Sequence, residues 1–157
     1  MISAPFQQKV NSMAEASKIL IVDSPYYQDI TDHLVSGAAD ALKDGGYAWE
    51  RISVPGVFEV PGAIALAAKS RENLSGFVAL GCVIRGETDH YDHICRESSR
   101  ACMELAVQSG LAIGFGILTC ETMDQALVRA DVNQGNKGRD AAEACLRMVD
   151  LKSRFRG

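Results

Sequence analysis

The sequence predicts a three-layer α/β fold, in which a parallel sheet carries helices on both faces. Short runs rich in Val and Ile alternate with longer segments whose apolar residues recur at helical spacing. Residues 77–84 are nearly all apolar, which is typical of a strand buried on both faces of a parallel sheet. Parallel neighbours need crossover connections, and helical segments separate these runs.

The first half of the chain supplies two strands and two helices. Residues 19–22 form a short β-branched run, which Pro25 ends because proline disfavours both helix and central strand. Apolar residues then recur at helical spacing: Ile30, Leu34, Ala38 and Leu42. Residues 47–54 alternate as a second strand, and Pro61 suits the first turn of a helix over residues 61–69.

The second half repeats this order. We expect strands over residues 77–84 and 112–119 and helices over residues 90–109, 123–130 and 138–152. Four strands are therefore predicted. We interpret residues 1–157 as a single domain, in which residues 1–17 form a mobile or interface-docked arm because they show little periodicity.

Composition narrows the functional classes. The 157 residues are 47% hydrophobic and 23% charged, with a net charge of -4 and no basic stripe, so no nucleic-acid partner is expected. No apolar run approaches the roughly 20 residues of a membrane span, and we expect a cytoplasmic protein without a membrane partner. Five scattered cysteines without a CxxC pair favour reduced thiols.

Polar and aromatic residues collect in the segments that follow the strands. In a parallel sheet these turns share one edge, where ligands bind. The turns expected on this rim are residues 24–27, 56–59, 85–90 and 119–123. They offer aromatic rings, the Glu59 carboxylate, the His90 imidazole and the free N–H groups of a helix start, which attract anions. Such a rim suits a polar ring with hydroxyls beside a phosphate or carboxylate.

Four segments carry a family resemblance. They are Pro55-Gly-Val-Phe-Glu-Val-Pro61, Gly81-Cys-Val-Ile-Arg-Gly-Glu-Thr-Asp-His90, Gly114-Phe-Gly-Ile-Leu-Thr119 and Asn136-Lys-Gly138. In this order and spacing the chain resembles the 6,7-dimethyl-8-ribityllumazine synthase family of riboflavin biosynthesis, from about residue 18 to 151. The resemblance implies a flavodoxin-like fold and a homopentamer with active sites between neighbouring subunits.

The resemblance also implies a transferase reaction without a cofactor or a metal. It condenses 5-amino-6-(D-ribitylamino)pyrimidine-2,4-dione with 3,4-dihydroxy-2-butanone 4-phosphate, through a Schiff base, phosphate elimination and ring closure. The products are 6,7-dimethyl-8-ribityllumazine, phosphate and water. By position, the resemblance assigns substrate binding to Tyr26, Val57, Phe58, Glu59, Val83, Ile84, Phe115 and Lys137, and phosphate binding to Gly86, Glu87, Thr88 and Arg129.

Within this assignment, Tyr26 stacks on the pyrimidine and Glu59 helps to hold the ribityl chain. Phe115 and Arg129 reach in from the neighbouring subunit. His90 is the predicted catalytic residue, because the reaction moves protons several times and an imidazole titrates near neutrality.

Several of these residues have simpler interpretations. His90 alone could cap a helix, or join His93, Asp89 and Asp92 around a metal, although the family needs none. Cys82 fits a buried apolar residue better than a nucleophile. The remaining structural alternatives are core positions for Phe58 and Phe115, and a solvated helix or surface position for Arg129 and Glu59.

The sequence also departs from the family pattern. Pro25-Tyr26-Tyr27 replaces the common Arg-Phe-Asn, and Asp89 places a carboxylate beside the phosphate turn, where it could orient His90 or cap the helix. Residues 131–135 differ from the run that accompanies sixty-subunit shells, which favours a free pentamer over a higher assembly. A weakly active or non-catalytic paralogue that binds lumazine or riboflavin, or an assembly scaffold, is the alternative function.

Overall fold

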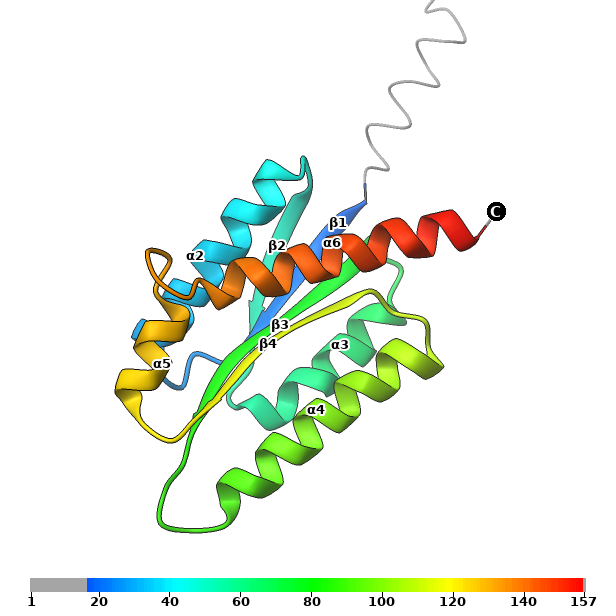
Figure 1. Cartoon of the computed structure of the whole chain (residues 1–157). Coiled ribbons are helices and arrows are strands. Elements are labelled where there is room, and N and C mark those ends of the chain that lie inside the picture. Colours follow the sequence, from blue (N-terminus) through cyan, green and yellow to red (C-terminus); the bar gives the residue numbers. More distant parts are fainter. Residues whose placement is uncertain (1–16, 157) are drawn as a thin grey trace, which may run out of the picture.

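The computed structural model describes residues 17–156 and contains one parallel sheet (Figure 1). Its strands are β1 (Lys18–Asp23), β2 (Ala48–Ser53), β3 (Leu74–Ile84) and β4 (Ile113–Cys120). They lie in the order β2-β1-β3-β4, and every neighbouring pair is parallel. The prediction of a four-stranded parallel sheet is confirmed, and all four strands therefore end at the same edge of the sheet.

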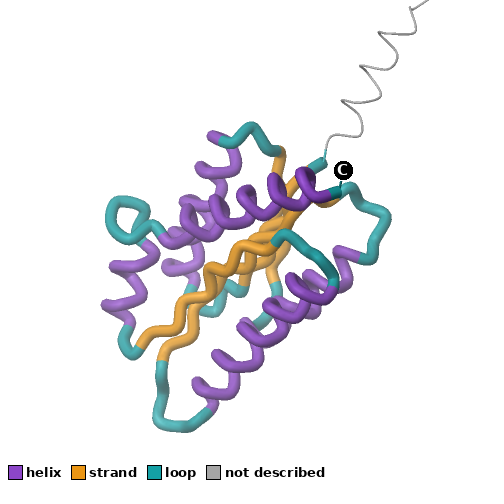
Figure 2. Tube along the Cα trace, turned by 45° about the vertical axis from the view of Figure 1, so that its right-hand side comes forward, coloured by secondary structure: helices purple, strands orange, loops and turns teal. Residues whose placement is uncertain are grey.

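Helices cover both faces of this sheet, as Figures 1 and 2 show. They are α2 (Gln28–Asp44), α3 (Val60–Ala68), α4 (His90–Gln108), α5 (Met123–Ala130) and α6 (Lys137–Phe155). The helices α2, α5 and α6 pack on one face, and α3 and α4 on the other. The arrangement is the predicted three-layer, flavodoxin-like sandwich. Within residues 17–156, no helix combines the length and apolar character that crossing a bilayer requires.

Two apolar cores explain why these segments adopt this fold. Beneath α2 and α6, residues such as Leu34, Val78 and Leu118 are buried together, and beneath α3 and α4 the residues Ile64 and Phe77 form the second core. The central strand β3 is buried continuously over residues 76–82, so its apolar run faces both cores. The buried strand β3 therefore holds its carboxyl end, where the candidate site lies, in a defined position.

Two details differ from the sequence prediction, and one prediction falls outside the described residues. Strand β3 begins at Leu74, before the apolar run, because Lys18 of β1 already pairs there. Residues expected as an open turn form a single 3₁₀ turn, η1 (Val57–Glu59), in which the Glu59 N–H donates to the Gly56 carbonyl. The predicted arm lies outside the described residues except for Ser17, whose hydroxyl is hydrogen-bonded with that of Ser75.

Candidate functional site

A cavity of about 710 Å³ opens at the carboxyl ends of the strands. It gathers residues from the turns after β1 and β2, from the end of β3 and from the first two turns of α4. Its lining consists of Ser24, Tyr26, Tyr27, Pro55, Gly56, Val57, Phe58, Glu59, Cys82, Val83, Ile84, His90 and Ile94. Three of the four predicted turns therefore meet in one cavity, although they lie far apart in the sequence.

The turn after β1 presents two aromatic rings to this cavity. The Tyr26 ring is 75% exposed and meets the Tyr27 ring edge-to-face, with centroids 5.0 Å apart. Burial raises the pKa of the Tyr27 phenol, and the neighbouring Tyr26 and Cys82 raise it further. The phenol of Tyr27 is therefore a neutral hydrogen-bonding group at physiological pH.

A buried carboxylate fixes the base of these turns. Asp23, the last residue of β1, is fully buried, and its carboxylate accepts hydrogen bonds from Arg51 and from the Ser53 hydroxyl, the latter at 2.8 Å. These bonds tie the ends of β1 and β2 together. Sequence reasoning missed this pair because the partners lie 28 and 30 residues apart; the one available signal is a charged residue closing an apolar strand.

The turn after β2 supplies a carboxylate and an exposed ring. Within η1, Val57 is buried, whereas the Phe58 ring is 62% exposed and Glu59 is exposed. The core interpretation of Phe58 is therefore wrong. Proline at the start of α3 ends the turn and directs the chain back over the sheet. The Glu59 carboxylate lies at the cavity, where it can accept hydrogen bonds from ligand hydroxyls.

The end of β3 forms the floor of the cavity. Val83 and Ile84 are half-buried there, and the Cys82 side chain is only 4% exposed. Burial raises the pKa of the Cys82 thiol to about 12, mainly through desolvation of the thiolate and then through the neighbouring Cys120. A thiol with this pKa is protonated at neutral pH, which agrees with the prediction that Cys82 is a buried apolar residue.

The predicted phosphate turn connects this floor to α4. Gly86, Glu87 and Thr88 are exposed between Ile84 and the first residue of the helix, and the Thr88 hydroxyl accepts a hydrogen bond from the His90 N–H at 3.3 Å. The turn follows the cavity lining directly in the chain. Backbone N–H groups at the start of a 19-residue helix make this a suitable position for an anion.

His90 begins α4 and lines the cavity, whereas His93 does not. The hypothesis that the Asp89 carboxylate caps this helix is wrong: Asp89 occupies the capping position without a side-chain hydrogen bond to the helix. Its carboxylate instead lies 3.4 Å from the imidazole of His93, one turn further on. Within residues 17–156, no group of three or more His, Cys, Asp or Glu side chains is arranged to hold a metal ion.

The predicted phosphate turn Gly86–Thr88 adjoins this cavity in the chain without lining it, and three further predicted residues do not line it either. Phe115 is 43% exposed and lines a separate hollow with residues of α4, so it is not a core residue. Arg129 donates to the Gln125 carbonyl at 3.1 Å, and Lys137 pairs with Asp140 at 3.1 Å. The resemblance assigned Phe115 and Arg129 to the cavity of a neighbouring subunit, and these roles stay predictions.

The cavity also contains residues that sequence reasoning did not assign. Ser24 is 1% exposed, and its hydroxyl has no hydrogen-bond partner within the part of the chain that the structure describes. Ile94 adds an apolar side chain from α4. Their sequence signal is weak, because Ser24 resembles any residue ending a strand and Ile94 any residue on the buried face of a helix.

Comparison with known proteins agrees with this geometry. The family model for 6,7-dimethyl-8-ribityllumazine synthase matches residues 16–153. A protein of that name from Novosphingobium aromaticivorans is 50% identical over 139 residues, covering 88% of this chain and 99% of the relative. The Bartonella tribocorum relative of the same name is 46% identical over 146 residues, covering 93% and 97%.

A third relative, 6,7-dimethyl-8-ribityllumazine synthase 1 from Rhizobium meliloti, is 47% identical over 141 residues and is covered to 92%. The family-model match, over residues 16–153, spans the sheet and every segment that lines the cavity. These matches confirm the resemblance drawn from the four sequence motifs. The chain belongs to the 6,7-dimethyl-8-ribityllumazine synthase family of transferases.

Proposed function

We propose that this chain condenses 5-amino-6-(D-ribitylamino)pyrimidine-2,4-dione with 3,4-dihydroxy-2-butanone 4-phosphate to form 6,7-dimethyl-8-ribityllumazine. The supporting observation is the cavity at the strand ends, where an imidazole, a carboxylate, an exposed ring and a phosphate-type turn adjoin one another in a member of this family. We expect the reaction to use no cofactor, because positioning of the substrates and proton transfer are tasks that side chains and main-chain groups can perform. We expect the enzyme to act in the cytoplasm.

The pyrimidine is proposed to bind between Tyr26 and the end of β3. The exposed Tyr26 ring offers a face for stacking, and the main-chain groups of Val83 and Ile84 can bond to the polar edge of the heterocycle. The ribityl chain then extends towards η1, where Glu59 accepts hydrogen bonds from its hydroxyls beside Val57 and Phe58. Hydrogen bonds with a charged carboxylate are the strong ones in such a site.

The phosphate ester is proposed to bind at Gly86–Thr88, next to the start of α4. Its negative charge is stabilised by exposed N–H groups, the Thr88 hydroxyl and the positive end of the helix. This places the ketone of the substrate near His90. The imidazole would then carry protons during Schiff-base formation, phosphate elimination and ring closure, while the two substrates stay fixed.

The site is proposed to be completed by a second subunit. Phe115, Arg129 and Lys137 do not line the cavity of their own chain, which supports a role across an interface in a ring of subunits. An arginine fork suits phosphate oxygens, and an additional ring suits the second face of the heterocycle. Light scattering would test this: a free pentamer has a mass of roughly 85 kDa, five times that of the 16.9 kDa chain.

The decisive experiment mixes the purified protein with the two substrates and follows lumazine fluorescence. We expect clear acceleration over the uncatalysed reaction in buffer. The control is the same protein with the phosphate-free ketone, which lacks the leaving group. Binding of the product without any acceleration would instead support the alternative, a lumazine- or riboflavin-binding paralogue.

Replacement of Glu59 by glutamine is expected to weaken binding of the ribityl product by about 10- to 100-fold, because a hydrogen bond to a charged group contributes about 1.5–3 kcal/mol. Fluorescence titration measures this affinity. The matched comparison is a lumazine with a methyl group in place of the ribityl chain, whose affinity should not change. Equal weakening for both ligands would contradict a role for Glu59 in holding the ribityl hydroxyls.

A further inference from the structure

Arg85 lies between the end of β3 and the phosphate turn, and the roles proposed above leave it unassigned. Its Nε donates to both carboxylate oxygens of Glu121, at 2.9 and 3.1 Å. Its two terminal nitrogens contact the Asp92 carboxylate at 3.3 and 3.4 Å, and its guanidinium stacks on the Tyr91 ring at 4.3 Å. The bonds with Glu121, followed by those with Asp92, raise the pKa of Arg85.

These contacts engage all three guanidinium nitrogens, through which an arginine binds phosphate. The guanidinium carries one positive charge and faces two carboxylates, so it offers no net positive charge to a second anion. Its main chain is fixed as well, because the Arg85 N–H donates to the Cys120 carbonyl at 2.9 Å. Arg85 is therefore held from three elements, β4, α4 and the turn before α5, immediately before Gly86.

The same network extends to α5. The Glu121 N–H donates to the side-chain oxygen of Gln125 at 2.9 Å, and the Gln125 carbonyl accepts a hydrogen bond from Arg129 at 3.1 Å. A continuous set of contacts thus connects the residue before the phosphate turn with the arginine that is proposed to bind phosphate in the next subunit. Loss of the Arg85 contacts would loosen both elements.

We propose that Arg85 is a positioning residue for phosphate recognition: through Glu121 and Asp92 it holds the turn Gly86–Thr88 in fixed register with the starts of α4 and α5. This inference rests on the proposed function, because it assigns the turn to the phosphate ester. The bound phosphate contacts the turn and not Arg85. Arg85 consequently affects binding of the phosphate-bearing substrate and leaves binding of the pyrimidine largely unchanged.

The test measures KM for each substrate, kcat, and the Kd of inorganic phosphate by calorimetry. We expect Arg85→Gln to raise the KM of the phosphate ester and the Kd of phosphate about tenfold, since a displaced binding group costs this much or more. The KM of the pyrimidine should change by less than about twofold. Arg85→Lys keeps the charge but not the planar fork, so its values should lie between those of Arg85→Gln and the unmodified protein.

A double variant separates position from charge. Arg85→Gln alone leaves the Glu121 and Asp92 carboxylates unbalanced near the anion, whereas Arg85→Gln combined with Glu121→Gln restores the original net charge. If Arg85 acts by holding the turn, the double variant still binds phosphate weakly. Recovery of the original affinity in the double variant would overturn the proposal in favour of simple charge compensation.

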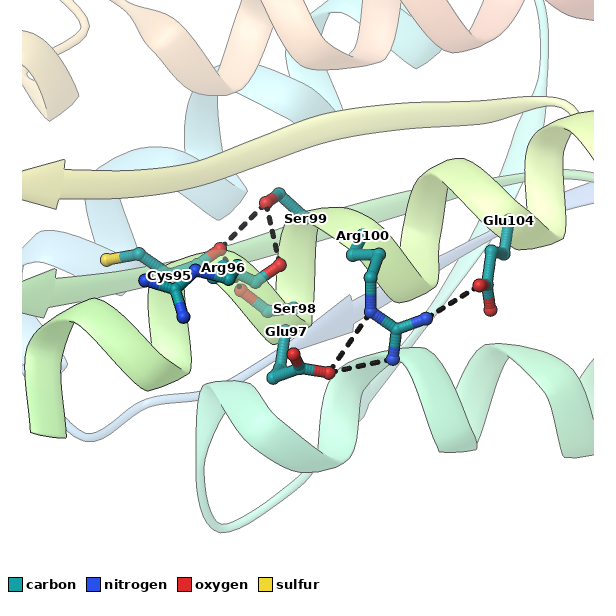
Figure 3. Close-up of polar contacts among 7 residues, drawn as sticks. All are labelled: Cys95, Arg96, Glu97, Ser98, Ser99, Arg100 and Glu104. Atoms are coloured by element: carbon teal, nitrogen blue, oxygen red, sulfur yellow. Dashed lines mark hydrogen bonds and ion pairs between the residues drawn. The ribbon is translucent and has the colours of Figure 1, made fainter.

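Arg100 provides the matched control. It lies on α4 and also contacts two carboxylates, Glu97 at 2.7 Å and Glu104 at 2.6 Å (Figure 3). Because α4 begins at His90, Arg100 lies more than two helical turns beyond the phosphate turn. Arg100→Gln removes the same charge from a similar ion-pair network. It should leave phosphate binding and both KM values unchanged.

Besides recovery of affinity in the double variant, three results would overturn the inference: an unchanged phosphate Kd in Arg85→Gln, an equal rise in both KM values, or an equal loss of phosphate binding in Arg100→Gln. If Arg85→Gln does not fold, the same comparison uses Arg85→Lys and Glu121→Gln, which keep part of the network. Phosphate binding is measured without turnover. A protein that binds phosphate through this turn but does not catalyse the condensation would therefore contradict the proposed function alone.

Discussion

Replacement of His90 by alanine is expected to lower kcat by about 10²- to 10⁴-fold, the usual contribution of a positioned acid or base. His90 is the imidazole that lines the cavity, and as the first residue of α4 it follows the proposed phosphate turn in the chain. Turnover should fall without disappearing, because the remaining cavity still holds the two substrates together. Stopped-flow or steady-state lumazine fluorescence at saturating substrate measures the effect.

His93→Ala supplies the control for this prediction. His93 lies one turn further along the same helix and pairs with Asp89, but it does not line the cavity. The removal of this second imidazole from α4 should leave kcat within about threefold of the unmodified protein. An unchanged kcat in His90→Ala at saturating substrates would remove His90 from the mechanism, and an equal loss in both variants would indicate disturbance of the helix.

Most of the strands and helices could be predicted from the sequence because they depend on local residue patterns. Strand β3 is recognisable from its apolar run alone, since a strand between two helical layers must be apolar on both faces. The start of α3 followed from Pro61, and the common rim followed from parallel connectivity. These inferences need only periodicity, turn residues and topology, all of which are visible in one sequence.

Side-chain partnerships could not be predicted in the same way. The Arg85–Glu121 pair joins residues 36 positions apart, and the Arg51–Asp23 pair joins residues 28 apart. No local pattern indicates which carboxylate an arginine will meet after folding. Asp89 shows that even a short-range contact can be mispredicted. Its residue type and position favour a helix cap, yet its carboxylate makes no capping hydrogen bond and lies 3.4 Å from the His93 imidazole. Residues four positions apart share one face of a helix, which brings the two side chains together.

Gly114→Ala is expected to destabilise the fold by about 3 kcal/mol or more, because it forces a methyl group into backbone. A Cβ at Gly114 would lie 1.8 Å from the Ala141 carbonyl oxygen, so α6 could not remain seated on β4. For a chain of this size the midpoint of thermal unfolding, Tm, should fall by roughly 10 °C. Calorimetry at one fixed protein concentration measures this, since assembly also shifts Tm.

Gly138→Ala tests the contact between α6 and α2. Its Cβ would lie 1.9 Å from the Leu34 carbonyl oxygen, so α6 would separate from α2 instead of from β4. We expect a comparable loss of stability. Because both glycines allow backbone to approach backbone, neither contact can be relieved by a change of side-chain rotamer.

Gly62→Ala is also a glycine-to-alanine change, but we expect it to raise the stability of the fold. A Cβ at this exposed position in α3 meets no atom within 4 Å, and alanine favours a helix by about 0.5–1 kcal/mol over glycine. Its Tm should rise by roughly 2 °C. If Gly114→Ala and Gly62→Ala shifted Tm alike, close packing of α6 on the sheet would not be the cause. Opposite shifts would show that packing of α6, which begins at Lys137, against β4 depends on the absence of a side chain at Gly114.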